Sequence, residues 1–200
     1  MIAFLKGTLS EALPTQVVID VNGVGYEVLI PLSSFDKLPT PGSEVKLLTH
    51  LAIRDDAHVL YGFSTETERD LFRQLIRHVT GIGPKIALNV LSGTTPASFQ
   101  AAVINGDVKA LSGVSGVGKK TAERIVVELK DKLGDGTDIK FGSGAPVSPE
   151  NQKMADAIAA LEALGSKPKD AQDAIRAAIA VLGPDKPVDE LVRAALQKGK

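Results

Sequence analysis

The feature that most constrains this chain is a short internal repeat. A segment that begins at Val79 (VTGIGPKIA) recurs 35 residues later at Val114 (VSGVGKKTA), and both copies match V-[TS]-G-[IV]-G-x-K-x-A. In each copy two glycines flank one aliphatic residue, and the residues on either side follow helical periodicity. Glycine allows a positive φ and a close backbone approach, and the aliphatic residue can enter a core. The repeat therefore predicts two equivalent tight turns, each joining two helices.

Each of these turns is a candidate phosphate-binding site. The helix that follows begins with backbone N–H groups that have no partner within the helix, and such a helix end binds anions. Lysine recurs at the same offset in both copies, so each turn can hold a nucleic-acid backbone without reading bases. One isolated turn would equally well serve only to connect two helices, and it is the duplication that favours binding. The candidate DNA-binding residues are Thr80, Gly81, Ile82, Gly83 and Lys85 in the first copy and Ser115, Gly116, Val117, Gly118, Lys119 and Lys120 in the second.

The second copy also comes close to the nucleotide-binding P-loop, G-x-x-x-x-G-K-[ST]. The match runs from Gly113 to Lys120, and it fails at the last position, where Lys120 replaces the hydroxyl residue that holds Mg²⁺. The segment before it is short and helical, whereas a P-loop follows a buried strand. We therefore reject an NTPase active site.

Composition excludes several other classes of function. The sequence has no Cys and only three scattered His residues, which argues against disulfides, thiolate catalysis and zinc sites. No metal or other cofactor is expected. No apolar stretch approaches the roughly 18 residues of a membrane span, and the first residues lack a signal-peptide pattern. We expect a cytoplasmic protein that does not associate with membranes.

Charge is distributed unevenly along the chain. Residues 1–63 carry four Lys/Arg against seven Asp/Glu, whereas residues 64–133 carry ten against seven. Both copies of the repeat lie in this basic part, which is consistent with a polyanionic ligand.

The first 63 residues have the pattern of a small β-barrel. Short β-branched runs alternate with turn signals such as Asn22-Gly23 and Thr40-Pro41-Gly42. The runs occupy residues 17–21, 25–31, 44–51 and 58–63. We expect an antiparallel barrel of the OB type with five or six strands.

The remainder of the chain is helical, which makes the fold class α+β. From Thr65 onward apolar residues follow helical spacing, and we assign residues 64–133 to one helical domain. Residues 134–149 are rich in Gly, Pro and Ser and are predicted to form a flexible linker. Residues 150–200 contain three amphipathic segments, and this domain resembles the three-helix ubiquitin-associated fold.

Taken together, these motifs resemble the RuvA family. The paired turns look like tandem helix-hairpin-helix motifs, and further matches cover essentially the whole chain. They are Met1-Ile2 with Gly7, residues 23–28, Thr49-His50, residues 54–57, residues 60–63 and residues 116–124.

The resemblance implies a non-catalytic, Holliday-junction-binding subunit of a branch-migration complex that acts in recombination and DNA repair. It further implies a homotetramer with fourfold symmetry, present on the four-way junction as one tetramer or two, that holds the junction open and square. The third domain would recruit the hexameric RuvB motor, which hydrolyses ATP, and the RuvC resolvase is a further candidate partner.

The resemblance also assigns roles to individual residues. Arg54 would lie near the strand crossover, and Asp55 and Asp56 would form an acidic pin that repels phosphates and helps to separate the strands. Without the resemblance, these aspartates read as an ordinary solvated turn. For the motor-binding surface we consider apolar residues of the third domain, although the same spacing is typical of a core. These residues are Leu164, Ile175, Ile179 and Leu182.

The chain departs from the family pattern at three positions: Asp55 where Glu is common, Thr80 where Asn often begins the first hairpin, and Ser166 where an aromatic residue is often found. The last departure concerns the motor-binding surface.

Two other classes of function are kept as alternatives. Asp55 and Asp56 could serve a metal-dependent nuclease, although no third acidic or His ligand has suitable spacing in the sequence. The chain could also be a protein-interaction adaptor that acts through its third domain.

Overall fold

The computed structural model describes residues 1–134, 149–183 and 185–198. The chain divides into two compact units, Met1–Gly142 and Ser143–Lys200. Helix α6 ends at Gly134 and helix α7 begins at Pro149, so residues 135–148 of the predicted linker lie outside the described residues.

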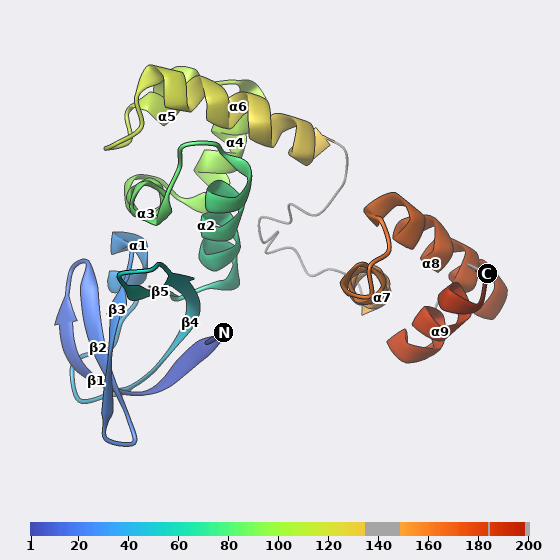
Figure 1. Ribbon diagram of the computed structural model, residues 1–200, viewed down its shortest axis with the longest axis horizontal. Helices are drawn as coiled ribbons and strands as arrows, with labels where there is room; N and C mark the ends of the chain where they lie inside the picture. Colours follow the sequence, from blue (N-terminus) through green and yellow to red (C-terminus); the bar gives the residue numbers. More distant parts are fainter. Residues whose placement is uncertain (135–148, 184, 199–200) are drawn as a thin grey trace. The chain divides into compact units, whose positions relative to one another are not determined.

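The first unit begins with a closed five-stranded barrel (Figure 1). Neighbouring strands follow the order β1-β2-β3-β5-β4, and β4 pairs with β1 to close the barrel. Every pair is antiparallel except β3 with β5, which is parallel. The strands are β1 (Phe4–Leu13), β2 (Gln16–Val21), β3 (Val24–Leu29), β4 (Glu44–Ile53) and β5 (His58–Phe63). The prediction of an OB-type barrel is confirmed, with five strands in the described residues.

Strand β1 was not among the β-branched runs of the sequence, because Thr8 is its only β-branched residue. A Cβ at Gly7 would collide with the backbone carbonyl of Asp20 on β2, so this position requires glycine for a close approach between strands. A register shift between Leu9 and Glu11 then bends β1 around the barrel.

Inward-facing aliphatic side chains fill the barrel. Along β2 and β4 they alternate with more exposed residues, as expected for a sheet with one face toward a core. The buried set is Leu5, Leu9, Val17, Ile19, Val28, Ile30, Val45 and Leu47.

Six helices belong to the first unit within the described residues (Figure 1). They are α1 (Leu32–Phe35), α2 (Glu66–His78), α3 (Pro84–Gly93), α4 (Pro96–Asn105), α5 (Val108–Ser112) and α6 (Lys119–Gly134). Helix α2 begins three residues after β5 ends, and Thr65 caps it through the N–H of Glu68 at 3.3 Å.

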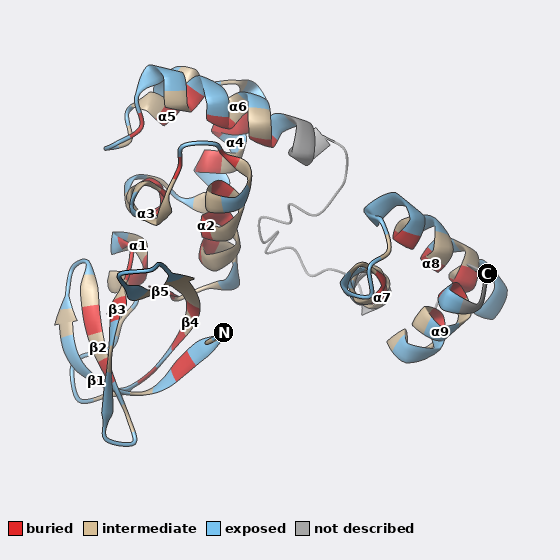
Figure 2. Ribbon diagram, viewed as in Figure 1, coloured by how far each residue is buried: buried red, intermediate tan, exposed pale blue. Residues whose placement is uncertain are grey.

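Barrel and helices share one apolar core. Tyr61 and Phe63 of β5 pack with Phe72 of α2 at ring centroid distances of 5.1 and 4.9 Å. This core continues through both repeat turns into α6, where it includes Leu129 (Figure 2). The barrel and the helical segment therefore form one packed body.

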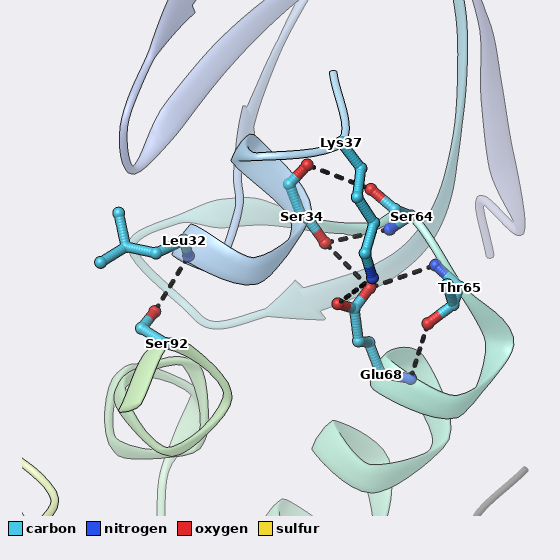
Figure 3. A network of polar contacts seen from close by, with 7 residues as sticks. All are labelled: Leu32, Ser34, Lys37, Ser64, Thr65, Glu68 and Ser92. Carbon is cyan, nitrogen blue, oxygen red and sulfur yellow. Dashed lines mark hydrogen bonds and ion pairs between the residues drawn. The ribbon is translucent and has the colours of Figure 1, made fainter. Parts of the chain in front are cut away.

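A polar joint reinforces this packing (Figure 3). The carboxylate of Glu68 is 1% exposed and accepts hydrogen bonds from Ser34 Oγ at 3.0 Å, Lys37 Nζ at 3.0 Å and the N–H of Thr65 at 3.2 Å. Burial by itself raises the pKa of Glu68, but the bonds from Lys37 and Ser34 and the charge of Lys37 outweigh it and hold that pKa below its usual value. We name this network the Glu68 joint. It connects the segment that contains α1, which lies between β3 and β4 in the sequence, to the start of α2.

The second unit is helical. It contains α7 (Pro149–Ala163), α8 (Pro168–Leu182) and α9 (Val188–Lys198) around a core of its own. Its buried residues are Ala157, Leu161, Ala171, Ile175, Ala178, Leu191 and Ala195. Within the described residues, no helix is long and apolar enough to cross a membrane.

Candidate nucleic-acid interface

The two copies of the repeat form turns of the same geometry. Gly81 has a φ of +87° and Gly116 a φ of +85°, the left-handed region that glycine adopts at little cost. The N–H of Ile82 donates to the carbonyl of Val79 at 3.1 Å, and the N–H of Val117 donates to that of Val114 at 2.9 Å. The predicted equivalence of the two turns is thus present in their backbones. From here on we call residues 79–83 the first hairpin turn and residues 114–118 the second.

The aliphatic residue of each turn is buried in the core. Ile82 is 5% exposed and Val117 is 3% exposed, and both belong to the cluster that contains Phe72 and Leu129. The side chains of Ile82 and Val117 therefore anchor the turns, and only the backbone of these two residues is available to a ligand.

The opposite side of each turn is open. A Cβ built at Gly83 or Gly118 would meet no atom within 4 Å. The first backbone bonds of the following helices are Ala87 N–H to Gly83 O at 3.0 Å and Ala122 N–H to Gly118 O at 2.9 Å. The N–H groups just before them have no acceptor in the part of the chain that the structure describes. They present partial positive charge at the start of α3 and of α6.

Three lysines stand beside these helix ends. Lys85, Lys119 and Lys120 are exposed, and none of them forms an ion pair with another described residue. Pro84 at the start of α3 has no N–H, so the first hairpin turn offers one backbone donor fewer than the second. Both turns nevertheless combine helix-end donors with lysine.

Thr80 has its backbone engaged within the protein. Its N–H donates to Glu128 Oε2 at 2.8 Å, and its carbonyl accepts from Arg124 Nη1 at 2.7 Å. Of the polar groups of Thr80, the hydroxyl is left for a ligand. Ser115, its counterpart in the second turn, is exposed. Arg124 and Glu128 lie one helical turn apart on α6, the helix that follows the second copy. The sequence pattern did not mark either of them as a site residue.

The predicted acidic pin is the turn between β4 and β5. Arg54 and Ala57 exchange backbone hydrogen bonds of 2.9 and 3.4 Å, which leaves Asp55 and Asp56 at the tip. Arg54 and both aspartates are exposed. The described residues include no hydrogen bond or ion pair between this tip and either hairpin turn. Within them, no three His, Asp or Glu side chains are grouped so that they could hold a metal ion.

Basic side chains of α2 face the barrel next to this region. Arg73 Nη2 donates to the carbonyl of Thr49 at 3.2 Å, and the ring of His50 lies 5.4 Å from that of Phe72. Burial, together with the charges of Arg73 and Arg77, lowers the pKa of His50. His50 is therefore uncharged at neutral pH. Burial raises the pKa of Tyr61, and the charge of Arg54 partly offsets this.

The four apolar residues considered for a partner in the second unit differ in exposure. Leu164 is 65% exposed and Leu182 is also exposed, whereas Ile179 is half-buried and packs against the core. Ile175 is fully buried, so it cannot contact a partner unless the core opens, and its helical spacing reflects packing. Val181 is exposed beside Leu182 on α8 and was missed, because helical spacing does not mark it.

Comparison with known proteins agrees with this architecture. The chain matches family models described as RuvA N terminal domain at residues 1–62, SAM-like helix-hairpin-helix tandem at residues 72–131 and RuvA, C-terminal domain at residues 152–198. A protein of Chromobacterium violaceum is 50% identical over 197 residues, which cover 98% of each chain. Proteins of Thioalkalivibrio sulfidiphilus and Coxiella burnetii are 46% and 45% identical, over 98% and 99% of this chain and 98% of each relative. All three relatives carry the name Holliday junction branch migration complex subunit RuvA. With three domain models in the expected order and identity along nearly its whole length, this chain belongs to the RuvA family.

Proposed function

We propose that this protein binds four-way DNA junctions through phosphate contacts made by its two hairpin turns. The observation that carries the proposal is the pair of turns with the same glycine φ and the same backbone hydrogen bond, each with an open helix end, an exposed lysine and a buried aliphatic anchor. Backbone N–H groups and lysines bind phosphate irrespective of base sequence. Two such sites in one compact unit would hold the backbone of a duplex arm at two places.

Recognition in this proposal depends on shape. Several copies of the protein, arranged around the junction, hold each arm at a fixed angle, and a single duplex cannot satisfy all of these sites at once. A homotetramer is the arrangement that would match four arms, with one copy of the protein for each arm. Either one tetramer or two face to face would bind the junction.

The tip formed by Asp55 and Asp56 would act at the strand crossover. Two exposed carboxylates repel nearby phosphates, which favours separation of strands that would otherwise re-pair. Arg54, directly before them, would hold a phosphate close to the crossover. The exposure of all three side chains supports this assignment.

The second unit would recruit the motor. We assign ATP hydrolysis to a RuvB hexamer and no catalytic step to this chain, and we place the motor contact at the exposed residues Leu164 and Leu182. RuvC resolvase would bind the same junction as a further partner. Because the proposed ligand is chromosomal DNA, we expect the protein in the cytoplasm.

A competition experiment tests the proposal. A labelled four-way junction is bound at several salt concentrations and challenged with unlabelled duplex of the same arm sequence. Retention of the junction complex under a large excess of duplex supports recognition of shape. Equal competition by duplex would leave a general DNA-binding protein and remove the basis for a role in branch migration.

A further inference from the structure

The equivalence of the two hairpin turns extends to the helices that contact them. Arg124 of α6 lies against Gly81, since a Cβ there would come within 3.1 Å of its Nη1. Asn89 of α3 is 35 residues earlier, and its Nδ2 lies 3.4 Å from the corresponding position at Gly116. Each turn is thus covered by the helix that follows the other turn.

The contacts themselves differ between the two halves. Arg124 and Glu128, one helical turn apart on α6, bond the carbonyl and the N–H of Thr80 at 2.7 and 2.8 Å. On α3, the residue that corresponds to Glu128 is Gly93, which has no side chain. A Cβ built at Gly93 would lie 3.4 Å from Cγ1 of Val114 in the second hairpin turn. No side chain among the described residues hydrogen-bonds the backbone of Ser115. The first turn therefore receives side-chain hydrogen bonds on its backbone from α6, whereas the second turn receives none from α3 at the corresponding residue.

We propose that Arg124 and Glu128 are positioning residues that make α6 the common support of both phosphate sites. Helix α6 carries the second site at its own N-terminus, next to Lys119 and Lys120, and its second and third turns hold the first site through the N–H and the carbonyl of Thr80. The spacing between the two sites is then set by one helix. This inference rests on the proposed function.

The position of Thr80 explains why holding its peptide matters. The residue directly precedes Gly81, whose positive φ turns the chain toward the open helix end. Without these two bonds the peptide groups on either side of Thr80 can rotate, and the N–H groups that follow would no longer point at one phosphate. Glu128 also brings a negative charge close to a phosphate site, which by itself disfavours DNA. A positioning role and a purely electrostatic role therefore predict opposite effects of removing Glu128.

Amide hydrogen exchange, measured without DNA, tests whether Glu128 holds the N–H of Thr80. Glu128→Gln keeps an oxygen acceptor, whereas Glu128→Ala removes it. We expect the Thr80 N–H to exchange at least about ten-fold faster in Glu128→Ala and within about two-fold of the parent rate in Glu128→Gln. The N–H of Val117, bonded within the second turn, serves as the internal control and should not change. Unchanged exchange at Thr80 in Glu128→Ala would overturn the proposal.

A double-mutant cycle tests the consequence for binding. Glu128→Ala should weaken junction binding by about five- to ten-fold, and Glu128→Gln should restore it. When Glu128→Ala is combined with Lys85→Ala, which affects the same site, the fold-loss in junction affinity should be clearly less than the product of the two single losses. When Glu128→Ala is combined with Lys119→Ala and Lys120→Ala, which affect the other site, the fold-losses in affinity should multiply. If Glu128→Ala folds poorly, Arg124→Met takes its place in this cycle, because it removes the hydrogen bond to the carbonyl of Thr80.

The outcomes separate the two proposals. Equal tightening of binding by Glu128→Ala and Glu128→Gln would show that the charge alone acts, and it would overturn the positioning role. Multiplicative losses with both sets of lysines would overturn the link to the first site. If the lysine variants by themselves leave junction binding unchanged, the proposed function fails and the positioning role in binding fails with it.

Discussion

Removal of Lys119 and Lys120 should change how binding depends on salt. Both side chains are exposed and form no ion pair with a described residue, so Lys119→Ala with Lys120→Ala should leave the fold intact. Each phosphate that a lysine neutralises contributes about 0.9 to the slope of log affinity against log salt for B-DNA. Two lost contacts should therefore flatten the slope by about 1.8 per duplex arm. Between 50 and 200 mM salt, the parent should lose about 12-fold more affinity than the variant.

Titration of a fluorescent single duplex arm at four salt concentrations measures this slope. Lys167→Ala with Lys169→Ala is the matched control, because it removes two exposed lysines from the second unit. The control should keep the parental slope. If the Lys119 and Lys120 variant keeps the parental slope as well, or if the control flattens it equally, these lysines do not contact phosphate and the assignment of the second hairpin turn is wrong.

Glu68→Gln should lower the free energy of unfolding at pH 7 by about 1–3 kcal/mol, as denaturant titration would show. The pKa of Glu68 is lowered in the folded state, so its contribution to stability is complete above its usual pKa near 4.5 and is lost as the pH falls below that value. Parent and variant should therefore have the same stability in acid. Asp55→Asn with Asp56→Asn should preserve or strengthen junction binding and reduce unpairing at the crossover, measured with 2-aminopurine; weaker binding would argue against a repulsive pin. Deletion of residues 150–200 should leave junction binding intact, because the first unit has its own cores, and should abolish stimulation of the RuvB ATPase.

The sequence predicted the architecture where the signal is periodic. Alternation in residues 17–21 and 44–51 identified barrel strands because one face of each is buried. Strand β1 was missed because Thr8 is its only β-branched residue. The close approach of Gly7 to β2 and the parallel pairing of β3 with β5 were missed because they join segments that no local pattern connects.

The candidate binding site was predictable to the extent that it is repeated. The duplicated glycines and lysines identified the turns, and the burial of Ile82 and Val117 agrees with their expected place in the core. Side chains that reach across from another helix, such as Glu128 to Thr80, could not be inferred from spacing within either copy. Ile175 shows the opposite difficulty, because helical spacing describes a core residue and a surface stripe in the same way.

Selectivity for a four-armed substrate requires phosphate sites held at fixed angles to the centre of the assembly. In the proposed complex two features of this protein would fix those angles: the Glu68 joint between barrel and helices, and the bonds from α6 to the first hairpin turn. Loosening either one should weaken junction binding more than duplex binding, because only the junction needs all sites in register. Removing Lys85 should instead weaken both by similar factors per arm, since one phosphate contact is lost in each. The ratio of junction to duplex affinity, measured for Glu68→Gln, Glu128→Ala and Lys85→Ala, separates these effects. An unchanged ratio in the first two variants would mean that the angle between sites does not determine selectivity.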